Sequence, residues 1–125
     1  MKEKIQTENA PKALGPYSQA IETEGKMLFV SGQIPLTSSG EFVGESIQAQ
    51  TKQCMENIKA ILTEAGYGLS HVVKVGIFLT DLANFDEVNA IYATYFEENP
   101  PARVCYEVAG LPKGVSIEID AIAVK

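Results

Sequence analysis

The sequence predicts an α+β fold: a mostly antiparallel sheet of five or six strands with two helices on one face. Two segments repeat apolar residues at helical spacing, and the other apolar segments are short and alternate as strands do. Their order along the chain is strand, two strands, helix, strand, helix, two strands. At 125 residues the chain has the length of one domain, so we expect a single domain over residues 1–125.

The N-terminal part predicts an edge strand, a loop and a hairpin. Residues 2–7 (KEKIQT) suit a short edge strand. Residues 9–19 contain two prolines and a glycine and suit an irregular, ordered loop. Residues 18–34 hold two apolar runs around a turn at residues 24–26, which is typical of a hairpin. A polar connection with two glycines follows at residues 35–45.

The first helix is predicted from Ser46 to Ala65. Ser46 suits the N-cap, where a side-chain oxygen accepts a hydrogen bond from the first turn. Gly66 suits the left-handed residue that follows a helix. Residues at helical spacing form one buried stripe, made of Ile47, Thr51, Cys54, Ile58, Ile61, Leu62 and Ala65.

A strand and a second helix follow. Residues 71–80 (HVVKVGIFLT) alternate as a strand does. Asn84 and Glu87 match a capping-box pattern and predict the start of the second helix, which residues 99–101 (NPP) should end. Its predicted stripe is Phe85, Val88, Tyr92, Tyr95 and Phe96.

The last two strands, at residues 102–109 and 115–125, are predicted to form a hairpin across residues 110–114 (GLPKG). Equal arm lengths would set Cys105 opposite Glu118 and Arg103 opposite Asp120. These four side chains would then share one face of the sheet, with cross-strand neighbours about 5 Å apart.

The last strand is apolar on both faces. Ile117, Ile119, Ala121 and Ala123 lie on one face, while Ile122 and Val124 make the end of the other face apolar. Two helices cover only one face of such a sheet. We therefore expect another subunit to cover the second face.

Charge and composition narrow the function classes. A net charge of −6 disfavours binding to nucleic acid or to anionic membranes. No apolar run has the length of a membrane span, and residues 1–10 lack a signal-peptide core. The two cysteines, Cys54 and Cys105, fit a reducing compartment. These features predict a cytoplasmic protein without nucleic-acid or membrane partners.

Arg103 and Glu118 are the candidate chemical groups. A guanidinium can hold a small carboxylate through two parallel hydrogen bonds, and a nearby glutamate can position a water or move a proton. The alternative for Arg103 is a surface ion pair with Asp120, worth under about 1 kcal/mol.

Other kinds of chemistry have little support in the sequence. Cys105 suits packing better than nucleophilic attack, because the single histidine, His71, is expected to be an exposed polar residue. Cys54 falls on the buried stripe of the first helix. Two separated cysteines and one histidine form no metal-ligand cluster, and no phosphate-binding motif is present. We expect neither a metal nor a cofactor.

Four segments carry a resemblance to a known family. They are GPYSQA (15–20), SGQIPL (31–36), FLTDLANFDEVNAIY (78–92) and PARVCYEVAGLPKGVSIEIDAIA (101–123). The chain resembles the RidA (YjgF) family of enamine/imine deaminases along essentially its whole length, and Arg103 matches the arginine that marks the active members.

The resemblance implies a chorismate-mutase-like fold and a homotrimer with active sites in the clefts between subunits. It implies hydrolysis of 2-iminobutanoate, 2-iminopropanoate and enamines such as 2-aminoacrylate to 2-keto acids and ammonium. Arg103 matches the residue that holds the substrate carboxylate, and Glu118 matches the one that orients water. The remaining matches to substrate-binding positions are Tyr17, Ser31, Gly32, Asn89 and Cys105.

One position departs from the family pattern. Many close members carry arginine where this chain has Gly110, which changes the charge near the cleft.

Two other functions are alternatives to the deaminase. A non-catalytic trimer that senses small carboxylates or regulates another protein would also use Arg103, although Glu118 adds nothing to a pure carboxylate binder. An RNA-cleaving function attached to some relatives fits poorly with the acidic charge.

Overall fold

The computed structural model describes residues 2–125, so Met1 of the predicted 1–125 domain lies outside the described residues. Over this range the chain forms six strands and two α-helices. In chain order they are β1 (Lys2–Ile5), β2 (Ala20–Thr23), β3 (Met27–Gln33), α1 (Ile47–Glu64), β4 (Val72–Leu79), α2 (Phe85–Ala93), β5 (Ala102–Glu107) and β6 (Ile117–Val124).

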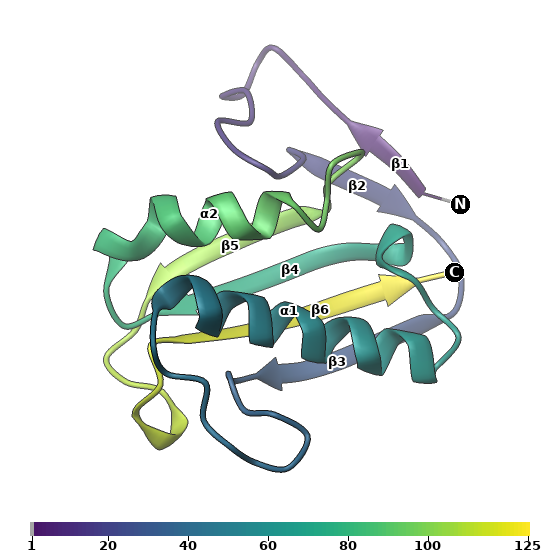
Figure 1. Cartoon of the computed structure of the whole chain (residues 1–125). Helices are drawn as coiled ribbons and strands as arrows, with labels where there is room; N and C mark the ends of the chain where they lie inside the picture. Colours follow the sequence, from purple (N-terminus) through teal and green to yellow (C-terminus); the bar gives the residue numbers. More distant parts are fainter. Residues whose placement is uncertain (1) are drawn as a thin grey trace.

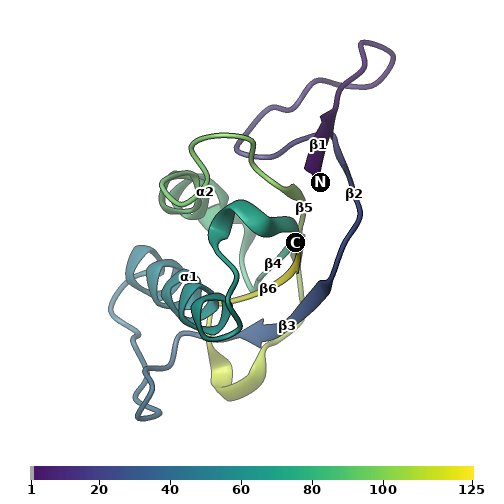
Figure 2. The same cartoon turned by 90° about the vertical axis from the view of Figure 1, so that its right-hand side faces the viewer.

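The strands form two sheets, and both helices lie on the same face of the larger one (Figures 1 and 2). The larger sheet has the order β3-β6-β4-β5, and β1 pairs with β2 in a separate two-stranded sheet. Only β4 and β5 pair in parallel; the other pairings between described strands are antiparallel. The predicted α+β class, the mostly antiparallel pairing and the two helices on one face are confirmed.

Helix α1 begins and ends where the sequence predicts. The Ser46 side chain accepts a hydrogen bond from the backbone N–H of Ala49 (3.0 Å). Ala65 is the C-cap, and Gly66 follows with φ +82°, a conformation that favours glycine. The helix packs on the sheet through its buried residues, which are Gln50, Thr51, Cys54, Met55, Ile58 and Leu62.

Helix α2 is shorter than predicted, and the structure at its N-terminus differs from the prediction. A 3₁₀ turn at Leu82–Asn84 precedes it, and Asp81 caps that turn by accepting from the N–H of Ala83 (2.9 Å). Asn84 occupies the N-cap position of α2 but makes no capping hydrogen bond, so the predicted capping box is wrong. The helix ends at Ala93, before Tyr95 and Phe96 of the predicted stripe.

The predicted hairpin of residues 18–34 does not form, because β2 and β3 belong to different sheets. The backbone of the expected turn is bonded to Lys125 instead: Lys26 and Lys125 exchange backbone hydrogen bonds of 2.8 and 3.1 Å. A β carbon on Gly25, whose φ is +138°, would lie 2.6 Å from the Lys125 carbonyl oxygen. The ladder between β3 and β6 thus extends into the turn, and β2 pairs with β1 instead.

The predicted hairpin between the last two strands is also wrong, because β4 lies between β5 and β6. Phe78 of β4 is paired with Tyr106 on one side and with Glu118 on the other. Strands that are neighbours in sequence are therefore not neighbours in the sheet. Chain order and alternation could not reveal this, since both arrangements have the same pattern of apolar residues.

We predict that Ser46→Ala lowers the free energy of unfolding by about 1 kcal/mol, because it removes the N-cap hydrogen bond of α1. Asn84→Ala should change it by less than about 0.5 kcal/mol, since Asn84 makes no such bond. Urea denaturation of the two variants checks the difference. Equal losses would contradict this assignment of the caps.

Candidate active site

Arg103 lies on β5, half-buried beneath α2. Its Cα is paired with that of Val75, a core residue, so its side chain points to the face of the sheet that the helices cover. Its Nη1 donates a hydrogen bond to Oδ1 of Asn89 on α2 (2.7 Å). The helix and the edge strand thus fix the guanidinium between them.

Three aromatic rings surround the Arg103 guanidinium. Its central carbon lies 5.3 Å from the ring centre of Tyr17, 5.7 Å from that of Phe85 and 5.2 Å from that of Tyr92. Such contacts stabilise a cation by about 0.5–2 kcal/mol each and favour a planar guanidinium. We call the set of Arg103, Asn89 and these three rings the arginine box.

The loop before β2 brings Tyr17 to the arginine box. Ser18 is buried and donates from its backbone N–H to the Pro101 carbonyl (3.1 Å). Gln19 donates to the Pro11 carbonyl (2.7 Å) and closes the loop on itself. The predicted irregular segment is therefore ordered by specific hydrogen bonds, and it ends directly beside β5.

The arginine box leaves most guanidinium donors available. Among residues 2–125, Asn89 is the hydrogen-bond partner of Arg103, and no carboxylate pairs with it. The alternative of an ion pair with Asp120 is wrong: Asp120 is on β6 and accepts a hydrogen bond from the Gly76 N–H (3.0 Å). A held cation with unpaired N–H groups suits an anionic ligand.

Cys105 lies two residues after Arg103 on the same face and packs against the core. Burial raises the pKa of the Cys105 thiol, and the positive charge of Arg103 opposes the shift. Burial, with a contribution from Glu118, raises the pKa of Cys54 to about 12. Both cysteines are free and protonated at neutral pH, which disfavours nucleophilic attack.

Glu118, Gly32 and Ser31 form a second group where β6 meets β3. The register between these strands shifts after Val30, which is a bulge that contains Ser31 and Gly32. A β carbon at Gly32 would clash with the Glu118 carboxylate. Glycine at this position therefore lets the carboxylate lie directly against the backbone of β3.

The two groups lie on opposite faces of the sheet. Glu118 is paired with Phe78, whereas Arg103 is paired with Val75, and side chains of β4 at an odd separation point to opposite faces. Two strand spacings, about 10 Å, also separate β5 from β6. The predicted common face for Arg103, Cys105, Glu118 and Asp120 is wrong, because β4 lies between their strands.

The face of the sheet opposite the helices carries large exposed side chains. Phe29 is 67% exposed and Tyr106 is 55% exposed, and both line a hollow with Ser31, Phe78, Val104 and Ile122. A soluble monomer rarely exposes such a patch without a partner. The alternation of β6 predicts that this face is apolar, but its most exposed residues lie on β3 and β5.

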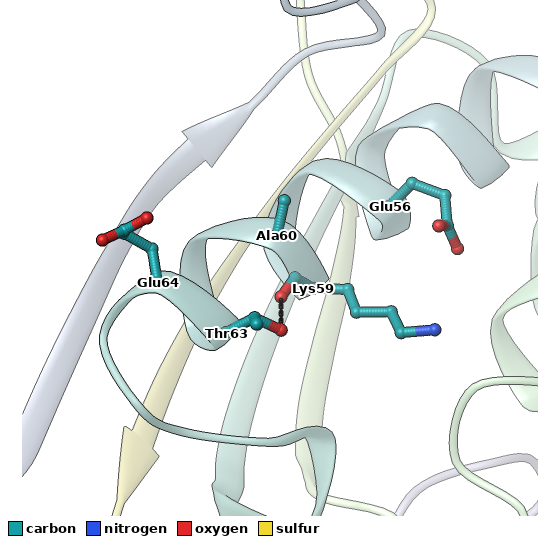
Figure 3. Close-up of a pocket in the computed structure, with 5 residues that line it drawn as sticks. All are labelled: Glu56, Lys59, Ala60, Thr63 and Glu64. Atoms are coloured by element: carbon teal, nitrogen blue, oxygen red, sulfur yellow. Dashed lines mark hydrogen bonds between the residues drawn. The ribbon is translucent and has the colours of Figure 1, made fainter.

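Another hollow lies on the outer surface of α1 (Figure 3) and is lined by Glu56, Lys59, Ala60, Thr63 and Glu64. All five residues come from one helix, and the Thr63 hydroxyl donates to the Lys59 carbonyl (2.9 Å). None of the predicted site residues contributes to this hollow. The geometry gives it no part in the candidate site.

Sequence reasoning missed two members of the arginine box, Phe85 and Tyr92, and placed them only in the core stripe of α2. Phe85, Asn89 and Tyr92 are spaced four and three residues apart, so they share one helix face. The available signal in the sequence was the amide of Asn89, which lies between two aromatic residues on that helix face.

Residues 2–125 contain no group of three or more His, Cys, Asp or Glu side chains placed to hold a metal ion. In the same range no helix has the length and apolarity needed to cross a membrane.

Comparison with known proteins identifies the relatives of the chain. A RutC family protein of Pyrococcus horikoshii is 56% identical over 126 residues, which cover 100% of this chain and 99% of the relative. The 2-iminobutanoate/2-iminopropanoate deaminase of Salmonella typhimurium is 48% identical over 128 residues, again 100% and 99% of the two chains. The crystal structure of E. coli TdcF with bound serine has 40% identity and a TM-score of 0.75, covering 98% of each chain.

A family model described as "Endoribonuclease L-PSP" matches residues 7–125. The fold agrees with this match, since the order β3-β6-β4-β5 with two helices on one face is the chorismate-mutase-like arrangement of the family. With relatives this similar over their whole length, the chain belongs to the endoribonuclease L-PSP family, which is also called the YjgF, RutC or RidA family.

Proposed function

We propose that this protein is a deaminase that hydrolyses short 2-imino acids and their enamine tautomers, such as 2-aminoacrylate, to 2-keto acids and ammonium. The observation that carries the proposal is the arginine box, because it holds a cation whose only hydrogen-bond partner among residues 2–125 is the Asn89 amide oxygen, which leaves most of its N–H groups for a ligand. The name of the Salmonella relative and the serine bound to E. coli TdcF support a small amino-acid-derived ligand.

The active site is completed by a second copy of the chain. Arg103 and Glu118 lie on opposite faces, so one chain cannot present both to one small substrate. In a homotrimer with cyclic symmetry, the Glu118 group of one subunit meets the arginine box of its neighbour in an inter-subunit cleft. The exposed Phe29 and Tyr106 supply apolar area for such contacts.

The reaction then needs two protein groups. Arg103 binds the carboxylate through parallel N–H donors, with Tyr17 and Asn89 fixing its plane. Glu118 takes a proton from water as the water oxygen bonds to the imine carbon, and the proton passes to the nitrogen. The C–N bond then breaks as the hydroxyl oxygen forms the carbonyl, and Glu118 passes the hydroxyl proton to the departing ammonia, so that one iminium and one water give one 2-keto acid and one ammonium ion.

This mechanism assigns the remaining predicted residues to binding. The bulge at Ser31 and Gly32 places backbone groups beside the Glu118 carboxylate, and Cys105 lines the arginine side as a neutral thiol. No step uses a metal or a cofactor. We propose a cytoplasmic location, with which two free cysteines agree. The net charge of −6 argues against an RNA substrate despite the description of the family model.

We predict that Arg103→Lys and Glu118→Gln separate binding from chemistry. Arg103→Lys keeps the charge but loses the planar fork, so pyruvate affinity measured by calorimetry should fall by more than about tenfold. Glu118→Gln should bind pyruvate at least as well as the wild type. Its hydrolysis of 2-aminoacrylate should fall by about two to four orders of magnitude.

The assay generates 2-aminoacrylate with a dehydratase and follows the appearance of pyruvate. A wild type that binds pyruvate but does not accelerate the reaction would favour the non-catalytic carboxylate-binding function. A Glu118→Gln variant as fast as an active wild type would remove Glu118 from the mechanism.

We also predict that Cys105→Ser retains most of the deaminase rate, because the thiol is protonated and no histidine lies beside it to activate it. The raised pKa of Cys105 implies slow alkylation by iodoacetamide at pH 7, with a rate that increases only as the pH approaches that raised pKa. Loss of activity together with a substrate adduct on Cys105 in mass spectrometry would overturn this assignment.

A further inference from the structure

Two hydrogen bonds from Ser18 fasten the loop before β2 to the segment that leads into β5. The Ser18 hydroxyl donates to the Pro100 carbonyl (2.5 Å), and its backbone N–H donates to the Pro101 carbonyl (3.1 Å). Proline has no N–H, so the backbone of these two residues can be hydrogen-bonded only through its carbonyl groups. Because Ser18 is only 4% exposed, water cannot readily replace its hydroxyl in this contact.

Both ends of this connection lie beside the arginine box. Tyr17 precedes Ser18, and its ring centre lies 5.3 Å from the Arg103 guanidinium carbon. Pro101 comes directly before β5, the strand that carries Arg103. A β carbon at Gly15 would lie 3.7 Å from the Tyr17 ring and 3.9 Å from Nη2 of Arg103. The backbone of the loop therefore also passes close to the guanidinium.

The start of β5 needs support because β5 is an edge strand. Among residues 2–125 it pairs with β4 alone, so no strand holds it on the far side. The ends of such elements open at little cost unless other contacts hold them. The bonds from Ser18 hold the end of β5 that carries Arg103, and they hold Tyr17 at the same time.

We propose that Ser18 is a positioning residue of the arginine box, which keeps the Tyr17 ring against the Arg103 guanidinium. Ser18 acts through Tyr17 and does not touch the ligand. The ring holds the planar guanidinium in the orientation that binds a carboxylate, and a group oriented in advance loses less freedom when the ligand arrives. The inference rests on the proposed carboxylate site.

The side chain of Arg103 can report on Tyr17 directly, because Arg103 is the only arginine in the sequence. Its Nε–H group gives a single arginine signal in a ¹H–¹⁵N NMR spectrum, and the ring current of Tyr17 shifts that signal. We expect Ser18→Ala to move the signal toward its position in Tyr17→Leu. Pyruvate affinity measured by calorimetry should fall by about threefold or more in both variants.

A double variant separates positioning from a general structural role. In the Tyr17→Leu background, Ser18→Ala should not lower pyruvate affinity further, because the ring through which Ser18 acts is absent. It should still lower the urea midpoint in that background, since the Pro100 carbonyl loses its donor. A general structural role would instead lower the affinity equally in both backgrounds.

Thr51→Ala is the matched control. Thr51 is also buried, and its hydroxyl donates to a backbone carbonyl, that of Ile47 within α1 (2.7 Å). The change removes the hydroxyl and a methyl group from the core, so the urea midpoint should fall. The Arg103 signal and the pyruvate affinity should stay as in the wild type, because Thr51 has no contact with Tyr17 or the start of β5.

Several results would overturn the inference. If the Arg103 signal moves in Tyr17→Leu but not in Ser18→Ala, the ring stays in place without the hydroxyl bond. Equal losses of affinity in the wild-type and Tyr17→Leu backgrounds would make Ser18 a structural residue only. If Arg103→Lys weakens binding and Ser18→Ala does not, this inference fails and the carboxylate site stands. If the wild type binds no pyruvate, the carboxylate site fails, and the inference fails with it.

Discussion

The position of β4 between β5 and β6 is the constraint on which the site depends. Val75, Ile77 and Leu79 are buried against the helices, so β4 is fixed in the centre of the sheet. Its parallel pairing with β5 directs Arg103 toward α2, and its antiparallel pairing with β6 directs Glu118 to the opposite face. The two groups that the proposed chemistry requires are consequently held apart within one chain, and the proposed site between subunits would unite them.

The arginine box shows how a charge can be kept half-buried and still available. Removing a guanidinium from water is costly unless other contacts compensate. Here three aromatic rings and the Asn89 amide compensate part of that cost while occupying few donors. In the proposed function, a carboxylate from the ligand supplies the remaining hydrogen bonds. In a protein with a net charge of −6, this local cation also counters a field that repels anions.

Local signals in the sequence predicted local structure well. Ser46 and Gly66 defined both ends of α1 because caps act within one turn, and alternation predicted the buried face of β6. Which strands pair with each other was harder to predict. Nothing in residues 102–125 distinguishes a hairpin from two strands separated by β4, so the relation of Arg103 to Glu118 was predicted wrongly. Tyr92 was assigned only to the core, since helical spacing reports burial and cannot report that its ring contacts the Arg103 guanidinium.

Subunit mixing tests the shared site most directly. Every mixed trimer that contains both Arg103→Lys and Glu118→Gln chains has one intact site, whereas trimers of a single variant have none. Equal co-expression should therefore restore activity at about one of every four sites. Mixing either chain with the double variant is the control and should restore none. Sedimentation must confirm a trimer mass, and tags on the two chains must confirm mixed assembly. Recovery near that fraction is the result we predict, whereas confirmed mixed trimers without recovered activity would contradict a site shared between subunits.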